Sequence, residues 1–465
     1  MAVLRLLRAG RWSWRRRRGP QQARRLTVFT VGDGPIHFHD LEASFQEFRA
    51  DECGAQISSA AKVVNDFLVS NGHPQPSFDV DGPPTFPSAP AEVVNARRQL
   101  LDASQAIFDL MFSPAEHLRW LACRYHDMSS LRWIYHFNIA ASVPLDRAVP
   151  FSEVAATAGV DEDRLKRILR HAMTNRLFCE PEPGLVAHTA ASALLVRSPA
   201  LNDWVGYTTE ETYPASAKLV EAYEKFGTSQ KPNESAYNIA FDTDEPMFVH
   251  LTKFPERERR FANTMVEMTS TEGYGTHHLV NGYPWEELGK ATVVDVGGST
   301  GHASIAIAEK ARDATFVIQD LATVVEQGKK SLPEGLKSRF TFQEHDFFTP
   351  QPVVGDVYLL RFILHDHPDA VATQIVKNLV PALRKGSRII INDGVLPEPN
   401  TLPRVEERIA RIMDLEMMTT FNARERPLAD WVKLCSDADP RLKLRRVSKP
   451  EGSVMSILEF VFDAD

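Results

Sequence analysis

The chain has 465 residues, of which 43% are hydrophobic, so it exceeds the length of one typical domain and supplies a substantial core. Its four cysteines lie far apart, which excludes a disulfide framework and a structural zinc site of paired cysteines. No apolar run approaches the roughly 20 residues that cross a bilayer. These properties predict a multidomain protein in a reducing compartment, and the cytoplasm is the expected location.

Positive charge is concentrated at the N-terminus. Residues 1–32 contain nine arginines and no acid, whereas the whole chain has a net charge of −8, so the remainder is clearly acidic. This composition is typical of a mitochondrial transit peptide, but it also fits a disordered basic arm or an upstream extension of the gene that is never translated. The sequence leaves these three explanations open.

Residues 33–130 form the next predicted segment. Apolar residues recur at helical spacing over 40–71, and six prolines make 72–90 an extended linker, because proline cannot continue a helix. Helices resume at Ala91, and a second strongly apolar stretch covers 118–141. Such wide apolar stripes need a packing partner, and a homodimer is one source.

Residues 131–200 contain the pattern of a winged helix, with Ser152 and Asp161 as predicted N-caps. The pattern comprises a helix at 151–158, a tight turn at 159–160 and a second helix at 161–175. A small hairpin follows, with its two strands at 177–179 and 185–188. Two functions fit: DNA binding through the basic residues of the second helix, or packing. An acidic chain, with three acids at the start of that helix, disfavours contact with phosphates.

The second half of the chain alternates strands with helices. Residues 201–290 are predicted as a helical connector that contributes to a substrate pocket, and residues 291–465 as an α/β domain. The expected strands lie at 292–296, 315–319, 340–344, 357–360, 388–392, 443–447 and 456–462. Seven strands with intervening helices indicate a doubly wound sheet, in which ligands bind beyond the C-terminal ends of the parallel strands.

The first of these strands runs into a glycine-rich turn that opens a helix. Asp295 lies near the end of the strand, and Gly297, Gly298 and Gly301 let the backbone approach a ligand closely. The turn lacks the G-x-G-x-x-G spacing that seats a pyrophosphate. A cofactor without phosphates, such as S-adenosylmethionine, therefore fits better than a dinucleotide.

Acids follow the second and third strands as well. Asp320 is placed to accept both ribose hydroxyls of a nucleoside, although a helix N-cap would explain it too. Asp346 is placed to accept an adenine amine, with Phe347 on the face of the ring. A solvated turn beside a core phenylalanine is the alternative explanation for this second pair.

His365, after the fourth strand, is the candidate general base, because it lies at a strand's C-terminal end directly before a helix that starts with proline. Asp393 and Glu425 are the two acids that would orient it, although either could simply pair with an arginine. A metal site of His365, Asp366 and His367 is the competing interpretation. Adjacent residues in a turn rarely converge on one ion, and no further ligand is evident.

From about residue 40 onward the chain resembles the cation-independent O-methyltransferases, the class that includes plant caffeate and flavonoid enzymes and fungal polyketide enzymes. The motifs that carry the resemblance lie at 294–301, 319–321, 345–348, 364–366, 392–397 and 424–426. The resemblance implies a class I methyltransferase sheet of Rossmann-like topology, preceded by a helical, winged-helix dimerisation domain. It also implies that S-adenosylmethionine is the cofactor and that no metal takes part.

Roles for individual residues follow from the same resemblance. It implies His365 as the general base, flanked by Asp393 and Glu425. The residues expected to bind the cofactor are Asp295, Gly297, Gly298, Gly301, Asp320, Leu321, Asp346, Phe347 and Arg361. Those expected to bind the acceptor are Phe261, Met265, Asp366, Met417, Phe421 and Asn422, although helical spacing would explain most of them as ordinary core. The sequence departs from the family pattern at three positions, with Ser299, Arg361 and His367 where glycine, lysine and tryptophan are common.

The expected reaction moves a methyl group to a phenolic hydroxyl of a small aromatic secondary metabolite, with a polyketide as the favoured class. Phenol and imidazole pKa values differ by about 3.5, so full prior deprotonation by the histidine would cost roughly 5 kcal/mol. A carboxylate on the other imidazole nitrogen would reduce this cost. A ligand-sensing winged-helix DNA regulator and a nicotinamide oxidoreductase are the competing functions. The expected partners are the acceptor and a second copy of the chain, with neither nucleic acid nor membrane.

Overall fold

The structure, a computed structural model, describes residues 49–463. The arginine-rich segment 1–32, residues 33–48 and the predicted start of the first helix lie outside the described residues. Within 49–463, none of the helices combines the length and the apolar character that crossing a bilayer requires. Contacts group the described residues into one unit, and the boundaries drawn from the sequence at 130, 200 and 290 stay predictions.

Two antiparallel helices begin the described chain. Helices α1 (Ala50–Ser70) and α2 (Ala91–Met111) pack through their alanine, valine and leucine side chains. The proline-rich linker between them has neither helix nor strand, as predicted, but the Arg197 guanidinium donates to the Val80 carbonyl at 2.7 Å and anchors it. The apolar stretch predicted over 118–141 divides into the helices α3 (Pro114–Cys123), α4 (Tyr125–His136) and α5 (Ile139–Ser142).

The winged-helix unit contains α6 (Phe151–Ala158) and α7 (Glu162–Thr174). Gly159 has a φ of 67° between them, a backbone conformation that glycine adopts without steric cost. The Asp161 carboxylate accepts the Arg164 backbone N–H at 3.0 Å, so it caps α7 as predicted. Ser152 is not a cap, because α6 already begins at Phe151.

The wing contains the predicted hairpin pairing at one residue pair, together with a strand pair that the sequence did not indicate. Strand β2 (Leu185–Val186) pairs with β1 (Val149–Pro150), which precedes α6, and Cys179 makes an isolated bridge to Ala187. On α7, ion pairs with Glu162 and Glu180 engage Lys166 and Arg170. These contacts use up two of the basic side chains that a DNA-reading helix would present.

A run of helices connects this unit to the sheet: α8 (Ala190–Arg197), α9 (Pro199–Tyr207), α10 (Tyr213–Ser216), α11 (Leu219–Phe226), α12 (Ala236–Ala240), α13 (Met247–Leu251), α14 (Pro255–Ser270) and α15 (Thr276–Asn281). Helix α9 continues directly into the π-helical turn η2 (Thr208–Thr212). Helices α9 and α14 pack along each other. Residues 201–290 are mostly helical, as predicted, and their contribution to a substrate pocket stays a prediction.

The seven predicted strands form one sheet, with bounds within two residues of those expected: β3 (Thr292–Val296), β4 (Thr315–Asp320), β5 (Phe340–Glu344), β6 (Val357–Arg361), β7 (Arg388–Gly394), β8 (Leu442–Ser448) and β9 (Met455–Phe462). The strand order is β5-β4-β3-β6-β7-β9-β8. Strands β3 to β7 are parallel, and β9 runs antiparallel to both of its neighbours.

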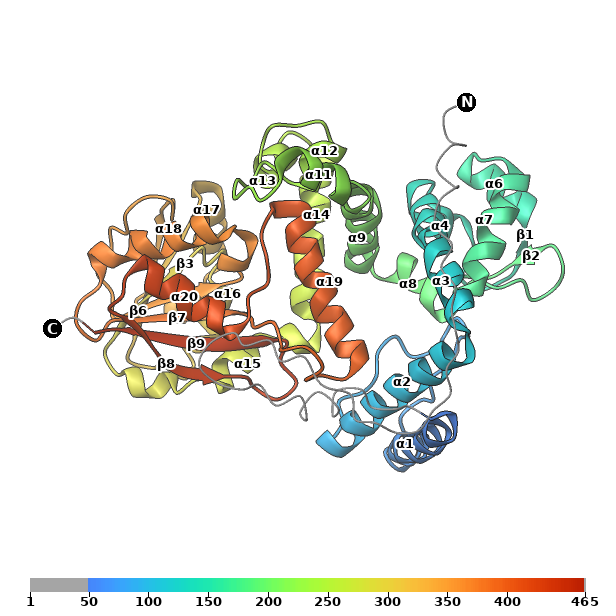
Figure 1. Ribbon diagram of the computed structural model, residues 1–465, viewed down its shortest axis with the longest axis horizontal. Helices are drawn as coiled ribbons and strands as arrows, with labels where there is room; N and C mark the ends of the chain where they lie inside the picture. Colours follow the sequence, from blue (N-terminus) through green and yellow to red (C-terminus); the bar gives the residue numbers. More distant parts are fainter. Residues whose placement is uncertain (1–48, 464–465) are drawn as a thin grey trace, which may run out of the picture. The chain divides into compact units, whose positions relative to one another are not determined.

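Alternate side chains of each strand serve two separate cores, because successive residues of a strand face opposite sides of the sheet. On β3, Val294 and Val296 pack with α18 (Asp369–Leu379) and α20 (Leu428–Ala438). Val293 faces the other core, with α15, α16 (His302–Ile307) and α17 (Ala322–Ser331). Figure 1 shows the sheet between these helices, with α19 (Arg404–Phe421) beyond the strand ends.

The topology locates the ligand site. The chain steps outward from β3 to β4 and β5 and then returns to β6, which pairs with the other side of β3. Loops at the C-terminal ends of β3 and β6 therefore diverge, and doubly wound sheets bind ligands at this switch point. The glycine turn follows β3, and the turn that carries His365 follows β6.

Candidate active site

The glycine turn after β3 is a tight backbone cradle. Gly297 has a φ of 70°, and a Cβ on this residue would lie 2.5 Å from the Ile363 side chain. A Cβ on Gly298 would lie 2.5 Å from the Asp295 carboxyl, which is buried and accepts the Ser304 hydroxyl at 2.6 Å. Asp295 thus supports the turn from beneath, and side chains at either glycine would deform it.

Asp320, at the end of β4, joins the glycine turn to the next helix. One carboxylate oxygen accepts the Ser299 N–H at 2.9 Å and the other accepts the Leu321 N–H at 2.8 Å. Each oxygen keeps a lone pair for a ligand. Leu321 is 63% exposed beside it, so a nucleoside bound here would cover an apolar side chain.

The segment after β5 lies across from the turn. The Asp346 carboxylate accepts the Phe348 N–H at 2.9 Å. The Phe347 ring lies 3.7 Å from the position of a Cβ on Gly297 and makes an edge contact with His367, with centroids 5.8 Å apart. An aromatic face and a carboxylate therefore stand next to the cradle, as the predicted adenine contacts require.

Arg361 ends β6, and protein groups contact every nitrogen of its guanidinium. It donates to the Asn392 side chain at 3.1 Å and to the Tyr274 carbonyl at 3.0 Å, and its third nitrogen lies 3.3 Å from the His302 ring. Arg361 thus braces β6 against β7. Its predicted contact with the cofactor stays a prediction.

These features fit S-adenosylmethionine. The cradle excludes side chains, and two carboxylates and an aromatic ring stand around it. Carboxylates suit ribose hydroxyls and a cationic cofactor, whereas they would repel a pyrophosphate. The residues that would hold this group are Gly297, Asp320, Asp346 and Phe347.

His365 lies on the short turn η6 (Leu364–Asp366) directly after β6, and its side chain is 13% exposed. Its Nδ1 lies 3.0 Å from the Glu425 carboxylate, and its Nε2 lies 3.4 Å from Asp366. The first contact favours a proton on Nδ1 and leaves Nε2 as the nitrogen for chemistry. Of the two acids predicted to orient the histidine, Glu425 makes the hydrogen bond.

Glu425 is itself positioned by its surroundings. Its backbone N–H donates to Asp414 at 3.0 Å, and a Cβ on Gly394, at the end of β7, would lie 2.7 Å from its carboxylate. The glycine after Asp393 is therefore required for Glu425 to reach His365. The predicted site residues around His365 come from three segments far apart in the sequence.

Asp393 is fully buried, and within the described chain neither carboxyl oxygen has a hydrogen-bond partner. Burial raises its pKa to about 7. Burial opposes protonation of His365, but the charges of Asp366, Asp393 and Glu425 outweigh it and raise the histidine pKa to about 10. Burial also raises the pKa of Asp366, to about 6. Three carboxyl groups therefore surround one imidazole.

A fully buried arginine that the sequence analysis did not single out holds this turn in place. Arg426 donates to the carbonyls of Leu364 and His367 at 2.7 Å each and to Asp369 at 2.8 Å. Its guanidinium also lies over the Trp431 ring at 5.2 Å. The motif at 424–426 thus supplies both the acid that contacts His365 and the cation that fixes the loop on each side of it.

Three of the predicted acceptor residues, Phe261 on α14 and Met417 and Phe421 on α19, belong to one apolar cluster. Phe261 packs on Tyr207 with centroids 5.3 Å apart, and Phe421 stacks on Phe248 at 5.0 Å. Met417 and Phe421 are almost fully buried in this cluster. Other apolar side chains of the two helices are exposed and lie outside this cluster: Val266, Ile412, Leu415 and Met418.

Asn422 has a different environment from the one predicted. It ends α19 with a φ of 54°, and its amide donates to the carbonyls of Ser229 at 2.9 Å and Lys231 at 3.0 Å. These bonds tie α19 to the loop before α12. Its contact with the acceptor stays a prediction, as do those of Phe261, Met265 and Asp366.

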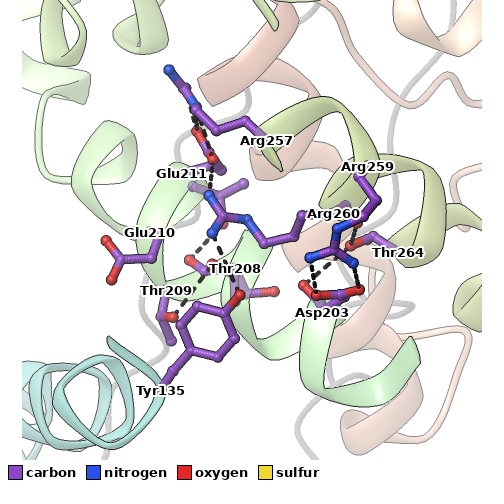
Figure 2. A network of polar contacts seen from close by, with 12 residues as sticks. Tyr135, Asp203, Thr208, Thr209, Glu210, Glu211, Arg257, Arg259, Arg260 and Thr264 are labelled. Atoms are coloured by element: carbon purple, nitrogen blue, oxygen red, sulfur yellow. Dashed lines mark hydrogen bonds and ion pairs between the residues drawn. The ribbon is translucent and has the colours of Figure 1, made fainter. Parts of the chain in front are cut away.

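A network of ion pairs and hydrogen bonds joins α9 and η2 to α14 (Figure 2). Glu211, which is 1% exposed, pairs with both Arg257 and Arg260. Asp203 accepts the Arg259 guanidinium at 2.6 Å and the Asn263 amide at 2.6 Å. The network fixes the helix that carries Phe261.

The predicted metal alternative finds no geometric support. Within residues 49–463, the side chains that bring three ligand atoms within 4.8 Å of one another are Glu272, His277 and His278, of which two are exposed. His365, Asp366 and His367 form no such group in that range.

Comparisons with known proteins show similarity to O-methyltransferases, in agreement with a site for S-adenosylmethionine. The profile of the O-methyltransferase domain matches residues 223–439. The chain is 42% identical over 415 residues to the O-methyltransferase VdtC of Byssochlamys spectabilis, covering 87% of this chain and 96% of the relative. It is 36% identical over 414 residues to the chlorophenol O-methyltransferase of Trichoderma longibrachiatum, covering 88% and 89%.

A solved structure shares the fold. The structure of LepI in complex with S-adenosylmethionine superposes with a TM-score of 0.67 at 22% identity, covering 88% of this chain and all of the other. The sheet and the cradle after β3 define a class I methyltransferase fold with a site for that cofactor. The chain belongs to the O-methyltransferase family, and it is an S-adenosylmethionine-dependent O-methyltransferase of secondary metabolism.

Proposed function

We propose that the enzyme methylates a phenolic hydroxyl of an aromatic secondary metabolite, in the polyketide class, with His365 as the general base. The observation that carries the proposal is the His365 imidazole, held through Nδ1 by Glu425 at 3.0 Å beside an aromatic and methionine-rich surface. A flat aromatic acceptor suits such a surface. The relative named for chlorophenol has a phenolic acceptor in its name.

The carboxyl groups around His365 bring the pKa of its imidazole close to that of a phenol. An unperturbed imidazole is a weaker base than phenolate by about 3.5 pKa units. The carboxylates around His365 raise its pKa to about 10, which makes proton transfer from a phenol nearly balanced in energy. The same shift protonates the imidazole in the free enzyme at neutral pH, so the fraction of neutral His365 increases from pH 7 towards 10.

Each residue around the base has a separate role. Glu425 orients the ring and stabilises the imidazolium, Asp393 contributes charge from beneath, and Arg426 fixes the loop. Bound S-adenosylmethionine supplies an electrophilic methyl group and a positive charge. That positive charge favours the phenolate and lowers the pKa of His365.

Mass spectrometry tests the function. The purified enzyme is incubated with S-adenosylmethionine and a panel of hydroxylated aromatic polyketides and phenylpropanoids, with and without EDTA. We expect an acceptor heavier by one methylene, insensitive to the chelator. Loss of product with EDTA would favour a metal mechanism, and no product with any phenol would contradict the acceptor class.

We also propose that the enzyme is a homodimer formed through its N-terminal helices. Exposed apolar side chains gather on α2, α3 and α4: Leu101, Phe108, Leu110, Met111, Leu118, Trp120, Leu121 and Tyr125. An apolar surface of this kind marks an interface. Sedimentation equilibrium is expected to give twice the chain mass, and Leu118→Glu together with Trp120→Glu should give the monomer. A monomeric wild type at micromolar concentration contradicts the proposal.

We propose a cytoplasmic location. All four cysteines are free thiols in the structure, as a reducing compartment requires. Fusion of residues 1–48 to a fluorescent protein tests the transit-peptide alternative. A diffuse signal is expected, and import into mitochondria would overturn the assignment.

A further inference from the structure

A phenylalanine close to His365 adopts a backbone conformation that is unusual for its residue type. Phe362, which directly follows β6, has a φ of 56°. The left-handed region is open to glycine but costs energy in a residue with a Cβ, and a bulky residue there is an outlier. Such strain persists where the surrounding structure enforces it, and it clusters at functional sites. The strain at Phe362 therefore points to a function for its side chain.

The left-handed turn redirects two neighbouring side chains. Successive residues of a strand alternate between its faces, so a straight continuation of β6 would carry Phe362 and Ile363 along the sheet. The turn instead brings the Ile363 side chain to the glycine cradle, 2.5 Å from the position of a Cβ on Gly297. It also brings the Phe362 ring beside His365, with ring centroids 5.8 Å apart and a tilt of 46°. One strained residue thus joins the cradle to the candidate base.

Two further neighbours fix the Phe362 ring. The Tyr274 ring lies against it, with centroids 5.8 Å apart and a tilt of 33°. The Arg361 guanidinium lies 4.6 Å from the ring centroid, within the range of a cation–π contact. The same guanidinium donates to the Tyr274 carbonyl at 3.0 Å and to the Asn392 side chain at 3.1 Å. The ring is therefore held between Tyr274, Arg361 and His365.

Backbone contacts hold the turn at both ends. Before the histidine, the Asn392 carbonyl accepts the Phe362 N–H at 3.3 Å. On either side of it, the Arg426 guanidinium donates to the Leu364 and His367 carbonyls at 2.7 Å each. Because the chain is anchored at these points, the left-handed conformation persists despite its cost.

We propose that Phe362 is a positioning residue for the general base: its ring packs against the His365 imidazole and keeps Nε2 directed at the acceptor hydroxyl. The inference rests on the proposed function, because Phe362 acts through His365. Glu425 holds Nδ1 at 3.0 Å, but one hydrogen bond does not fix the tilt of an imidazole ring. A flat side chain against the imidazole does, and a misplacement of about 1 Å can cost about 10²-fold in rate.

Substitution of the ring tests this role. Phe362→Leu keeps a Cβ and much of the volume but loses the flat ring, so kcat should fall by about tenfold to a hundredfold. The acceptor KM and the affinity for S-adenosylhomocysteine should stay within a few fold. Phe362→Gly removes the backbone strain together with the ring, and it should lose at least as much turnover. Phe362→Tyr keeps the ring and should retain most of the turnover.

A double-mutant cycle separates positioning from a general structural effect. If Phe362 acts through the base, adding Phe362→Leu to His365→Ala should leave the residual turnover unchanged, because coupled residues are not additive. A structural effect would instead multiply the two losses. A further loss of about tenfold in the double variant, or wild-type kcat in Phe362→Leu or Phe362→Gly, overturns the inference.

The matched control is Phe178→Leu in the winged-helix unit. Phe178 is buried and also left-handed, with a φ of 61°, and its ring centroid lies 5.1 Å from that of His188. This variant should keep kcat, although the loss of a buried ring lowers its stability. Thermal unfolding and S-adenosylhomocysteine affinity check that each variant is folded.

The failure of this inference is distinguishable from that of the proposed function. Undiminished turnover in His365→Ala would contradict the base assignment itself. Turnover that is lost in His365→Ala but unchanged in Phe362→Leu would leave the base in place and overturn only the role of Phe362.

Discussion

The molecule contains two buried clusters of charge that differ in balance. Around Glu211, one carboxylate meets the two cations Arg257 and Arg260. Around His365, three carboxyl groups surround one imidazole, and Asp393 has no hydrogen-bond partner among the described residues. The first cluster joins helices. In the second cluster, burial and the excess of carboxyl groups shift the pKa values of His365, Asp366 and Asp393. Strongly shifted pKa values are typical of a reactive site.

The largest expected effect is on turnover. His365→Ala removes the proposed base, so kcat should fall by about 10²–10⁴-fold, the usual contribution of general base catalysis. The affinity for S-adenosylhomocysteine, measured by titration calorimetry, should stay within a few fold. His277→Ala, which removes an exposed histidine, is the control. Undiminished turnover in His365→Ala would refute the base assignment.

Removing the carboxylate from the cluster around Glu211 should lower the free energy of unfolding. Glu211→Gln leaves Arg257 and Arg260 without their counter-ion, and removal of one partner from a buried pair costs about 3–5 kcal/mol. The neighbouring Glu210 pairs with the half-exposed Arg132, so Glu210→Gln should cost under about 1 kcal/mol. Denaturant unfolding measures both.

The same experiment sharpens the contrast with the second cluster. Asp393→Asn removes a buried carboxyl group that has no hydrogen-bond partner in the described chain and whose pKa burial raises to about 7, so it should leave the free energy of unfolding at neutral pH unchanged or raise it. Equal losses in Glu211→Gln and Asp393→Asn would show that the two clusters do not differ as described.

The dependence of kcat on pH tests the cluster around His365. Neighbouring carboxylates raise the pKa of His365 to about 10, so its neutral, reactive form is lost as pH falls below that value. Glu425→Gln removes one of these charges and should move the acid limb of the kcat profile to lower pH by about 1 unit or more, with a lower maximum. Glu334→Gln removes a carboxylate that is 86% exposed and is the control. If the acid limb did not shift, Glu425 would not be one of the groups that raise the pKa of His365.

The smallest expected effect concerns the cradle. Ser299 has a φ of 52°, a conformation that costs a residue with a Cβ roughly 1–2 kcal/mol. Ser299→Gly relieves this strain but makes the unfolded chain more flexible, so the net gain in stability should be below about 1 kcal/mol. Denaturant unfolding would detect it, and a loss of stability would mean that the serine side chain contributes more than its strain costs.

Local pattern predicted the sheet almost completely. All seven strands lie where alternation and β-branched runs placed them, and Asp161 caps α7. The errors lie where partners are distant in sequence. The pairing of β2 with β1 was not predicted, because β1 is only two residues long, too short for a pattern. The cap of α6 was misplaced because its N-cap residue is Pro150, which has no polar side chain to mark the helix start.

The sequence by itself determined which residues stand at the strand ends, because a glycine turn, an acid or a histidine directly after an apolar run can be read locally. Only the tertiary structure decided which acid holds His365, since Glu425 reaches it across 60 residues past a glycine that leaves room. It also decided that Arg426 fixes the loop on both sides of His365. A charge becomes functional through burial and through the partners it lacks, and both are properties of packing rather than of spacing.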